Sequence, residues 1–365
     1  MSGGRVALDT TVAALDLAGT GNHIRSLAES LTPILGDRLA CIRSRFAAPH
    51  AGPRTAVQMA RTLVRDLWWH QGGVERAARR AEADLLHLPA MLGPLRGRLP
   101  TVVTIHDLYV LRAPRGFRPW FRNYARVVVP RLARRAARVI TDSEATRTDV
   151  VDLLGVPGER VTVVPCGVRH PAPEGGREPP DLDLPPRFVL AVGTLEPRKN
   201  LVRLVEAIGL LATRPATRDV VLLHAGGYGW LAEDIVRAAN AAALRGRVRL
   251  LGRVKPDVLS ALYRRARLLA YPSLFEGFGL PVLEAMVHGC PVVTSDRSSL
   301  PEVAGDAAVL VDPESAESIA AGIARVWEDD ALAADLRARG LARAGGFSWE
   351  RTARETAEVY RSVLG

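Results

Sequence analysis

The sequence predicts an α/β protein built from two doubly wound, Rossmann-like domains that face one another across a cleft. Short runs of β-branched and apolar residues alternate with helical patterns along almost all of its 365 residues. A stretch of proline, glycine and acidic residues interrupts this alternation near the middle of the chain. A chain of this length also exceeds what one hydrophobic core usually serves, so two domains are expected.

The first half of the chain contains five runs that are typical of buried strands, at 5–10, 85–89, 101–107, 138–143 and 160–165. Between them, apolar residues spaced three and four apart predict helices at 21–35 and 120–137. Strands and helices in alternation indicate a parallel sheet covered by helices. Residues 1–170 are therefore predicted to form the first domain.

Residues 171–186, PAPEGGREPPDLDLPP, show no apolar periodicity and are predicted to be a linker. The alternation then restarts, with strands expected at 187–195, 219–227, 247–254, 267–273, 291–296 and 307–313. These predict a second domain over 187–346. The final segment, 347–365, is an amphipathic helix with Ser348 as its expected cap, and it is predicted to pack back on the first domain.

Composition narrows the classes of protein that are possible. The chain is 48% hydrophobic and 24% charged, as in globular proteins. No apolar run approaches the ~20 residues of a membrane span, and the first residues lack the apolar core of a signal peptide. The three cysteines lie far apart and without metal-ligand spacing. We therefore expect a cytoplasmic setting with neither a disulfide framework nor a bound metal.

Charge is distributed unevenly along the chain. Residues 1–180 hold 26 arginines against 16 acidic residues, whereas residues 181–365 hold 23 basic and 23 acidic residues. A basic half can meet nucleic acid, anionic lipid or a phosphorylated substrate. Because no RNA-binding aromatic signature or zinc finger accompanies the arginines, no nucleic-acid partner is predicted. The chain also has 47 arginines but only two lysines, Lys199 and Lys255. Because lysine and arginine are not interchangeable at a phosphate, so rare a residue suggests a specific role.

The segment FEGFGLPVLEAMVHG (275–289) carries the strongest chemical signal. It predicts a loop followed by a helix with Pro281 at its first position, and Glu284 in its first turn. A helix start preceded by Gly277 and Gly279 presents unpaired N–H groups and favours an anion. Carboxylates on both sides, Glu276 and Glu284, fit hydroxyl groups that flank the anion. Each carboxylate alone would be ordinary loop or helix-dipole charge, but together they predict a nucleotide-sugar site.

At this point the sequence resembles retaining glycosyltransferases of family 4, which have the GT-B fold. The resemblance rests on RLLAYPSLFEGFGLPVLEAMVHGCPVVTSDRSSLPEVAGDAAVLVDP (267–313), AVGTLEPRKN (191–200), LLGRV (250–254) and FSWE (347–350). It extends to AGTGNHIRSL (18–27), TIHDL (104–108) and TDSE (141–144). It thus covers nearly the whole chain and implies a hexosyltransferase with an N-terminal acceptor domain and a C-terminal donor domain.

The resemblance implies a role for individual residues of the donor domain. Glu276 would bind hydroxyls of the donor sugar, and Glu284 those of the ribose. Arg198 and Lys199 would neutralise the diphosphate. The sugar and the diphosphate would be faced by the loop segment Gly277, Phe278, Gly279 and Leu280. The base would lie near Arg253 and Val254.

In the first domain, the resemblance implies that Gly19 and Gly21 admit the phosphate and that His106 contacts the donor sugar. By itself, a lone histidine after a buried strand is usually a core residue, although the strand-end position next to Asp107 favours function. The sequence departs from the family at Thr194, where arginine is frequent, and at Cys166, where asparagine is common.

The implied reaction is transfer of a sugar from a nucleoside diphosphate to an acceptor hydroxyl, with retention and without a metal or other cofactor. General likeness to polysaccharide mannosyl- and rhamnosyltransferases favours GDP-mannose as donor. The arginine-rich segment 117–139 has two interpretations: a helix that meets anionic membrane beside a lipid-linked acceptor, or an ordinary sheet-covering helix. Two alternative functions are a nucleotide-sugar 2-epimerase and a non-catalytic scaffold that binds nucleotide sugars.

Overall fold

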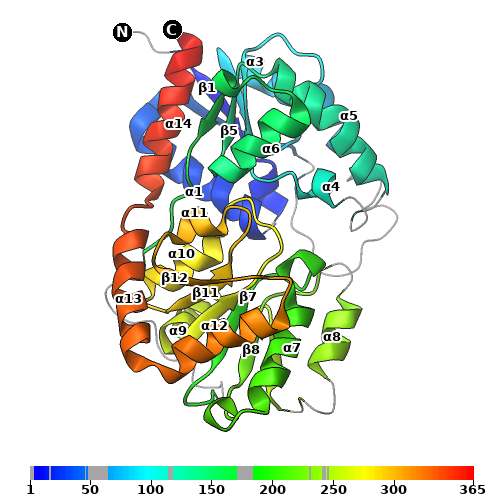
Figure 1. Cartoon of the computed structure of the whole chain (residues 1–365). Coiled ribbons are helices and arrows are strands. Elements are labelled where there is room, and N and C mark those ends of the chain that lie inside the picture. The colour runs from blue at the N-terminus through cyan, green and yellow to red at the C-terminus, as the bar shows by residue number, and fades with distance from the viewer. Residues whose placement is uncertain are drawn as a thin grey trace. The chain divides into compact units, whose positions relative to one another are not determined.

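The computed structural model describes residues 4–15, 18–45, 47, 65–113, 117, 119–170, 184–229, 232–240, 244 and 246–365. It divides the chain into two compact units (Figure 1). The first unit comprises residues 1–167 together with 348–365, and the second comprises residues 168–347. Of the predicted linker 171–186, residues 171–183 lie outside the described residues.

The first unit is a six-stranded parallel sheet with the strand order β2-β1-β3-β4-β5-β6. Its strands are β1 (Val6–Asp9), β2 (Leu39–Ile42), β3 (Leu85–Leu88), β4 (Thr101–Ile105), β5 (Arg138–Thr141) and β6 (Val161–Val163). Its helices are α1 (Ala18–Leu35), α3 (Val74–Arg80), α4 (Tyr109–Arg112), α5 (Pro119–Arg135), α6 (Glu144–Leu154) and α14 (Trp349–Leu364), with a π-helix over Arg65–Gly73. Short 3₁₀ turns cover Val12–Leu15, Gly36–Arg38 and Gly158–Arg160.

The last helix, α14, completes this first unit. In Figure 1, α14 (red) lies along α1 (blue), and the two helices pack together. Ser348 caps α14 as predicted, because its Oγ accepts a hydrogen bond of 3.2 Å from the backbone N of Arg351. The buried Tyr360 hydroxyl lies 2.6 Å from Nδ1 of His87 on β3, so the end of the chain is joined to the middle of the sheet.

One face of helix α5 packs against the sheet of this unit, as in an ordinary sheet-covering helix. Ala125, Val129, Leu132 and Ala133 are buried in the core cluster that also contains residues of β3, β4 and β5. This burial uses the apolar face of α5 and leaves arginines outside. None of the described helices is both long and apolar enough to cross a lipid bilayer.

The second unit is also a six-stranded parallel sheet, with the strand order β12-β11-β10-β7-β8-β9. Its strands are β7 (Val189–Val192), β8 (Leu222–Ala225), β9 (Val248–Gly252), β10 (Leu268–Tyr271), β11 (Val292–Ser295) and β12 (Ala308–Val311). Its helices are α7 (Leu201–Ala212), α8 (Glu233–Ala239), α9 (Pro256–Arg265), α10 (Leu280–Val287), α11 (Leu300–Ala304), α12 (Ala316–Glu328) and α13 (Asp330–Ala344). Two 3₁₀ turns cover Pro197–Lys199 and Pro215–Thr217.

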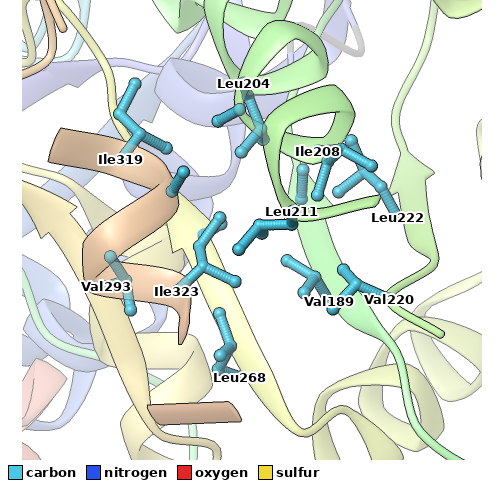
Figure 2. Packing of buried hydrophobic residues seen from close by; sticks show 14 of the residues in the cluster. Val189, Leu204, Ile208, Leu211, Val220, Leu222, Leu268, Val293, Ile319 and Ile323 are labelled. Carbon is cyan, nitrogen blue, oxygen red and sulfur yellow. The ribbon is translucent and has the colours of Figure 1, made fainter. Parts of the chain in front are cut away.

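The core of the second unit shows why these residues form these elements. Figure 2 shows side chains of α7 and α12 packed on one face of the sheet, among them Leu204, Ile208 and Ile323. Alternate strand residues, such as Val189 and Leu268, point into this cluster, as the period of two in a strand requires. Strands covered on both faces read as continuous apolar runs, which is why the sequence predicted them.

The strand order of the second unit locates its binding edge. Its first strand, β7, lies beside β10, and from this pair the order runs outward in both directions. In doubly wound sheets, ligands bind outside the carboxyl ends of the strands where the order reverses. The loops that follow β7 and β10 therefore meet at the position that favours a ligand. Two helix-covered parallel sheets confirm the predicted fold class, whereas the sequence analysis did not predict β2, the π-helix, α3, α4 or α6.

Candidate active site

The loop after β7 forms a tight turn that presents two cations. Pro197–Lys199 is a single 3₁₀ turn, and it ends at Asn200, whose φ of 59° is left-handed. Asparagine tolerates this conformation better than most residues with a side chain. The buried Asn200 amide donates to the carbonyl oxygens of Pro272 (3.0 Å) and Pro313 (2.6 Å), which fixes the turn to the loops that follow β10 and β12.

The loop after β10 presents a carboxylate, and two serines hold its backbone. Ser298 Oγ donates to the carbonyl oxygen of Glu276 at 2.5 Å. Ser299 Oγ lies 2.9 Å from the same carbonyl oxygen and 2.8 Å from that of Phe278. Ser298 itself adopts a left-handed φ of 57°. The loop is therefore shaped by the segment after β11, which the sequence analysis did not assign to the site.

The two loops join in one ion-pair cluster around Glu276. Lys199 Nζ donates to Glu276 Oε1 at 2.7 Å, and Arg198 Nη1 donates to Oε2 at 3.1 Å. The Tyr271 hydroxyl, at the end of β10, donates to Oε1 at 2.9 Å and accepts from Lys199. Arg198 also pairs with Glu196. The residues predicted from two separate motifs thus form one cluster around a buried carboxylate, with Tyr271 and Glu196 as members that the sequence analysis missed.

The cluster sets the ionisation of Glu276. Burial alone would raise the pKa of this carboxyl, but the charges of Lys199 and Arg198 outweigh burial and lower it to about 2. Burial lowers the pKa of Lys199, and the charge of Glu276 opposes that change. Burial raises the pKa of Glu196. Glu276 is therefore an ionised acceptor at neutral pH, which suits it to bind hydroxyl groups.

The start of α10 follows this carboxylate directly. Gly279 precedes the helix with a φ of 106°, and a Cβ at this position would lie 2.6 Å from Leu300 Cδ2. Both the backbone conformation and the packing therefore require glycine. The first N–H groups of a helix have no partner within the helix, so Leu280 and the residues before it are placed to meet an anion.

Glu284 departs from the predicted position. Helix α10 begins at Leu280, so Pro281 is its second residue and Glu284 is the fifth, beyond the first turn. The prediction that Glu284 lies in the first turn was wrong by one residue, because the helix begins one residue before the proline. Glu284 Oε2 accepts a hydrogen bond of 2.9 Å from the Tyr263 hydroxyl. Burial raises the pKa of Glu284, and the hydrogen bond from Tyr263 and the charge of Lys199 partly offset this.

Arg253 and Val254 lie farther along the same edge. They follow β9, which is the outermost strand and is separated from β7 by β8. Arg253 is exposed and Val254 is partly buried. The structure therefore places them at the carboxyl end of the sheet but not in the Glu276 cluster.

The remaining predicted residues belong to the first unit. Gly19 and Gly21 lie in the first turn of α1, and no atom of the described residues, apart from the two chain neighbours and the nearby backbone of the helix itself, would lie within 4 Å of a Cβ at Gly19. His23 of the same helix stacks edge-on against His106 with a centroid distance of 4.6 Å. Helix α1 and the end of β4 thus meet at one edge of this sheet.

His106 is held by two acceptors of its own unit. Its Nδ1 lies 2.6 Å from Asp142 Oδ2, and its Nε2 lies 3.1 Å from the carbonyl oxygen of Pro89. Its side chain is 20% exposed, whereas that of Asp142 is 4% exposed. Nδ1 of His23 lies 3.3 Å from Sγ of Cys166, the residue at which the sequence departs from the family pattern. Asp142 directly follows β5, and the sequence analysis did not assign it to the site although it lies in the predicted strand 138–143 and in the TDSE motif.

Three side chains here could hold a metal ion by their chemistry. His23, His106 and Asp142 each offer a ligand atom, and these atoms lie within 4.8 Å of one another. Among the described residues, no other group of three or more histidine, cysteine or carboxylate side chains has ligand atoms this close together. The short contact between His106 and Asp142 is, however, a hydrogen bond in length.

Comparison with known families bears on both units. The family model described as "Glycosyltransferase Family 4" matches residues 17–170. The model described as "Glycosyl transferases group 1" matches residues 176–343. Together the two models account for most of both units.

Two curated relatives from Escherichia coli are mannosyltransferases by name. O-antigen chain mannosyltransferase B is 34% identical over 271 residues, which are 71% of this chain and 70% of the relative. Serotype-specific mannosyltransferase WbdA is 30% identical over 276 residues, which are 72% of this chain. The match spans 34% of WbdA, so this chain corresponds to about a third of that protein.

A solved structure resembles the whole chain. The crystal structure of Anabaena HepE in complex with UDP and glucose has a TM-score of 0.73 and 21% sequence identity, and it covers 98% of this chain and 100% of the other. At this level of identity, the likeness concerns the fold.

Proposed function

This chain is a hexosyltransferase of glycosyltransferase family 4 with the GT-B fold, and from that premise we propose that it transfers a mannosyl group from GDP-mannose to an acceptor hydroxyl. The acceptor would be a glycan, a glycolipid or a small molecule. We place the reaction in the cytoplasm, with a lipid-linked acceptor reached at an anionic membrane surface. The proposal includes retention at the anomeric carbon and no requirement for a metal.

One observation carries the proposal: Glu276 is an ionised, buried carboxylate held between Lys199 and Arg198 where the strand order reverses. A carboxylate fixed in this way accepts hydrogen bonds from sugar hydroxyls without reorganising. The two cations and the start of α10 lie beside it and suit a diphosphate. The mannosyltransferase relatives support the choice of sugar.

These residues also suggest how transfer would proceed. Negative charge grows on the departing diphosphate, and Arg198 and Lys199 would stabilise it electrostatically. When a diphosphate binds, each cation can exchange part of its contact with Glu276 for the phosphate oxygens, which releases the carboxylate toward the sugar. Attack from the face of the leaving group, with the phosphate taking the acceptor proton, would give retention.

Ligand binding is the first test. We expect GDP to raise the melting temperature more than UDP, ADP or TDP, and EDTA to leave this shift unchanged. A ligand at ~100 times its dissociation constant stabilises the native state by about 2.7 kcal/mol, which a melting curve resolves. No shift with any nucleotide would contradict the donor site, and a shift abolished by EDTA would contradict metal independence.

Turnover is the second test, and the chain offers a matched control in its only two lysines. Lys199→Ala and Glu276→Ala should each lower transfer at least a hundredfold, because each removes part of the cluster. Lys255→Ala changes an exposed residue just before α9 and should leave transfer unchanged. Acceptors should include a lipid-linked sugar in anionic vesicles, and the anomeric proton signal of the product reports retention or inversion.

The same assay separates the alternatives. An epimerase would convert the donor to its 2-epimer without any acceptor, and a scaffold would bind nucleotide with neither reaction. Equal turnover in Glu276→Ala and the native chain would rule out the assigned site.

A further inference from the structure

The first unit has an open pocket of about 500 Å³ at the amino end of its sheet. The pocket is lined by three segments, among them Glu75 and Arg79 of α3, Arg96, Gly97 and Arg98 of the loop before β4, and Arg135 at the end of α5. The second and third segments lead into the first residues of β4 and β5. His106, in contrast, follows the last residue of β4. The pocket and the candidate site residues of this unit therefore lie at opposite edges of the same sheet.

The loop that carries two of these arginines is held from both sides. Glu75 is buried, and its Oε1 accepts hydrogen bonds from the backbone N of Arg98 (2.7 Å) and from Arg79 Nη2 (2.8 Å). From α5, Arg135 Nη2 donates to the carbonyl oxygen of Gly97 at 2.7 Å. The backbone of the loop is thus fixed to α3 through a buried carboxylate and to α5 through a guanidinium group.

Gly97 allows this close approach. A Cβ at this position would lie 2.3 Å from Glu75 Oε2 and 3.0 Å from Arg135 Nη2. Any side chain would therefore push the loop away from α3 and α5, and glycine is the residue that leaves both groups in place. The sequence Arg-Gly-Arg at 96–98 combines this requirement with a guanidinium group on each side of it.

The pocket has a surplus of positive charge that the fold does not neutralise. Its lining contains four guanidinium groups and one carboxylate, a surplus of three positive charges. Glu75 binds the backbone of Arg98 rather than its side chain. No described residue accepts a hydrogen bond from the guanidinium group of Arg96 or Arg98, and both side chains are exposed. Their N–H groups are therefore available to an anion, and the fork of a guanidinium matches the oxygen atoms of a phosphate.

We propose that this pocket binds a phosphate group, as a second anion site in addition to the cations of the donor site in the second unit. A carboxylate would offset only one of the surplus charges, whereas a phosphate monoester carries roughly two negative charges at neutral pH. The volume is within the range of sites that hold a small molecule, so the pocket accommodates a phosphate together with the molecule that carries it. The site also gives a partner of opposite charge to the arginine-rich first half of the sequence.

Calorimetric titration of the full chain with pyrophosphate at low salt tests the site. Because the Lys199 cluster also suits a diphosphate, the titration uses Lys199→Ala, which leaves the pocket intact. In this background, Arg96→Ala/Arg98→Ala should weaken binding at least about tenfold, because two charge-assisted contacts are lost. Arg38→Ala/Arg354→Ala is the matched control, since it removes two exposed arginines of the same unit outside the pocket and should leave the affinity unchanged.

Gly97→Ala tests the geometry of the site without changing its charge. The added Cβ displaces the loop from Glu75 and Arg135, so this variant should also bind pyrophosphate more weakly than the Lys199→Ala background. Melting curves establish that each variant is folded. Unchanged binding in Gly97→Ala, or an equal loss in the Arg38→Ala/Arg354→Ala control, would show that the chain attracts anions through its overall charge and would overturn the proposal.

Vesicle flotation identifies the source of the phosphate. If the pocket binds a lipid head group, the native chain floats with phosphatidylglycerol vesicles but not with phosphatidylcholine vesicles, pyrophosphate releases it, and Arg96→Ala/Arg98→Ala stays unbound. If the ligand is a soluble phosphorylated molecule, pyrophosphate binding depends on these arginines and flotation does not. Pyrophosphate binding and flotation that are both the same with and without Arg96 and Arg98 would overturn the proposal. None of these results depends on sugar transfer, so they stand apart from the tests of the proposed function.

Discussion

Two glutamates eight positions apart show how far the environment of a residue can change its chemistry. Glu276 pairs with two cations, and its pKa is lowered to about 2. Glu284 meets the Tyr263 hydroxyl, and burial raises its pKa. A motif indicates that both carboxylates belong to one site, but it cannot assign their ionisation. That depends on Tyr263, Lys199 and other partners that lie far away in the sequence.

Glu276→Gln should change how stability depends on pH. Because the folded pKa of Glu276 lies below its ordinary value of 4.5, the carboxylate stabilises the fold above pH 4.5 and loses this effect as pH falls toward about 2. The full effect is roughly 3 kcal/mol, of which about 1 kcal/mol is lost by pH 3.5. Urea denaturation at pH 6 and pH 3.5 should show the difference between native chain and variant shrinking. Parallel pH dependences would contradict the prediction.

Glu284→Gln is the control of opposite sign. A carboxyl whose folded pKa is raised favours folding when protonated and loses this contribution as pH rises through its ordinary pKa. The native chain should therefore lose stability relative to Glu284→Gln between pH 3.5 and pH 6. The same trend in both variants would show that the effect is not specific to the ion pairs.

At the scale of elements, buried strands could be predicted and the parts between them could not. The strands of both sheets are apolar because helices cover both faces. The edge strand β2, Leu39–Ile42, is only partly buried and gives no such signal. The turn that presents Arg198 and Lys199 was found by its motif, but its shape depends on Asn200 and on carbonyl groups of two distant loops.

Two substitutions of Asn200 should separate the contribution of its amide hydrogen bonds from that of its left-handed backbone conformation. Asn200→Ala loses both amide hydrogen bonds, at about 1 kcal/mol each. It also keeps a Cβ in the left-handed region without the short polar side chain by which asparagine tolerates this conformation, which we expect to cost about 1 kcal/mol more. Asn200→Gly loses only the hydrogen bonds. We expect losses of roughly 3 and 2 kcal/mol in urea denaturation. Equal losses in the two variants would show that the backbone conformation costs nothing there.

At the scale of the whole molecule, the first unit is built from two segments that lie at opposite ends of the sequence. Residues 348–365 belong to the first unit although they follow all of the second. The sequence predicted this return of the last helix, and its contacts explain it: α14 packs on α1, and the Tyr360 hydroxyl meets His87. Those tertiary partners could not be predicted from any local pattern.

Tyr360→Phe should weaken the first unit alone. It removes a hydrogen bond of 2.6 Å to a buried histidine, which we expect to lower stability by about 1–3 kcal/mol. Amide hydrogen exchange should speed up in β3, β4 and α14 and stay unchanged in α7 and α12. Thr217→Val, which removes a buried 2.8 Å hydrogen bond to Leu211 in the second unit, should give the reverse pattern. Uniform acceleration in either variant would mean that the units unfold together.

The place of α14 has a consequence for synthesis on the ribosome. Domains usually fold in the order in which they emerge. Here residues 168–347 are complete before residues 348–365 have been made, so the second unit can fold while the first still lacks a helix that its sheet and α1 require. During synthesis, the first unit therefore exposes the surface that later binds α14. Although its first segment is made first, this unit is the last to complete its fold.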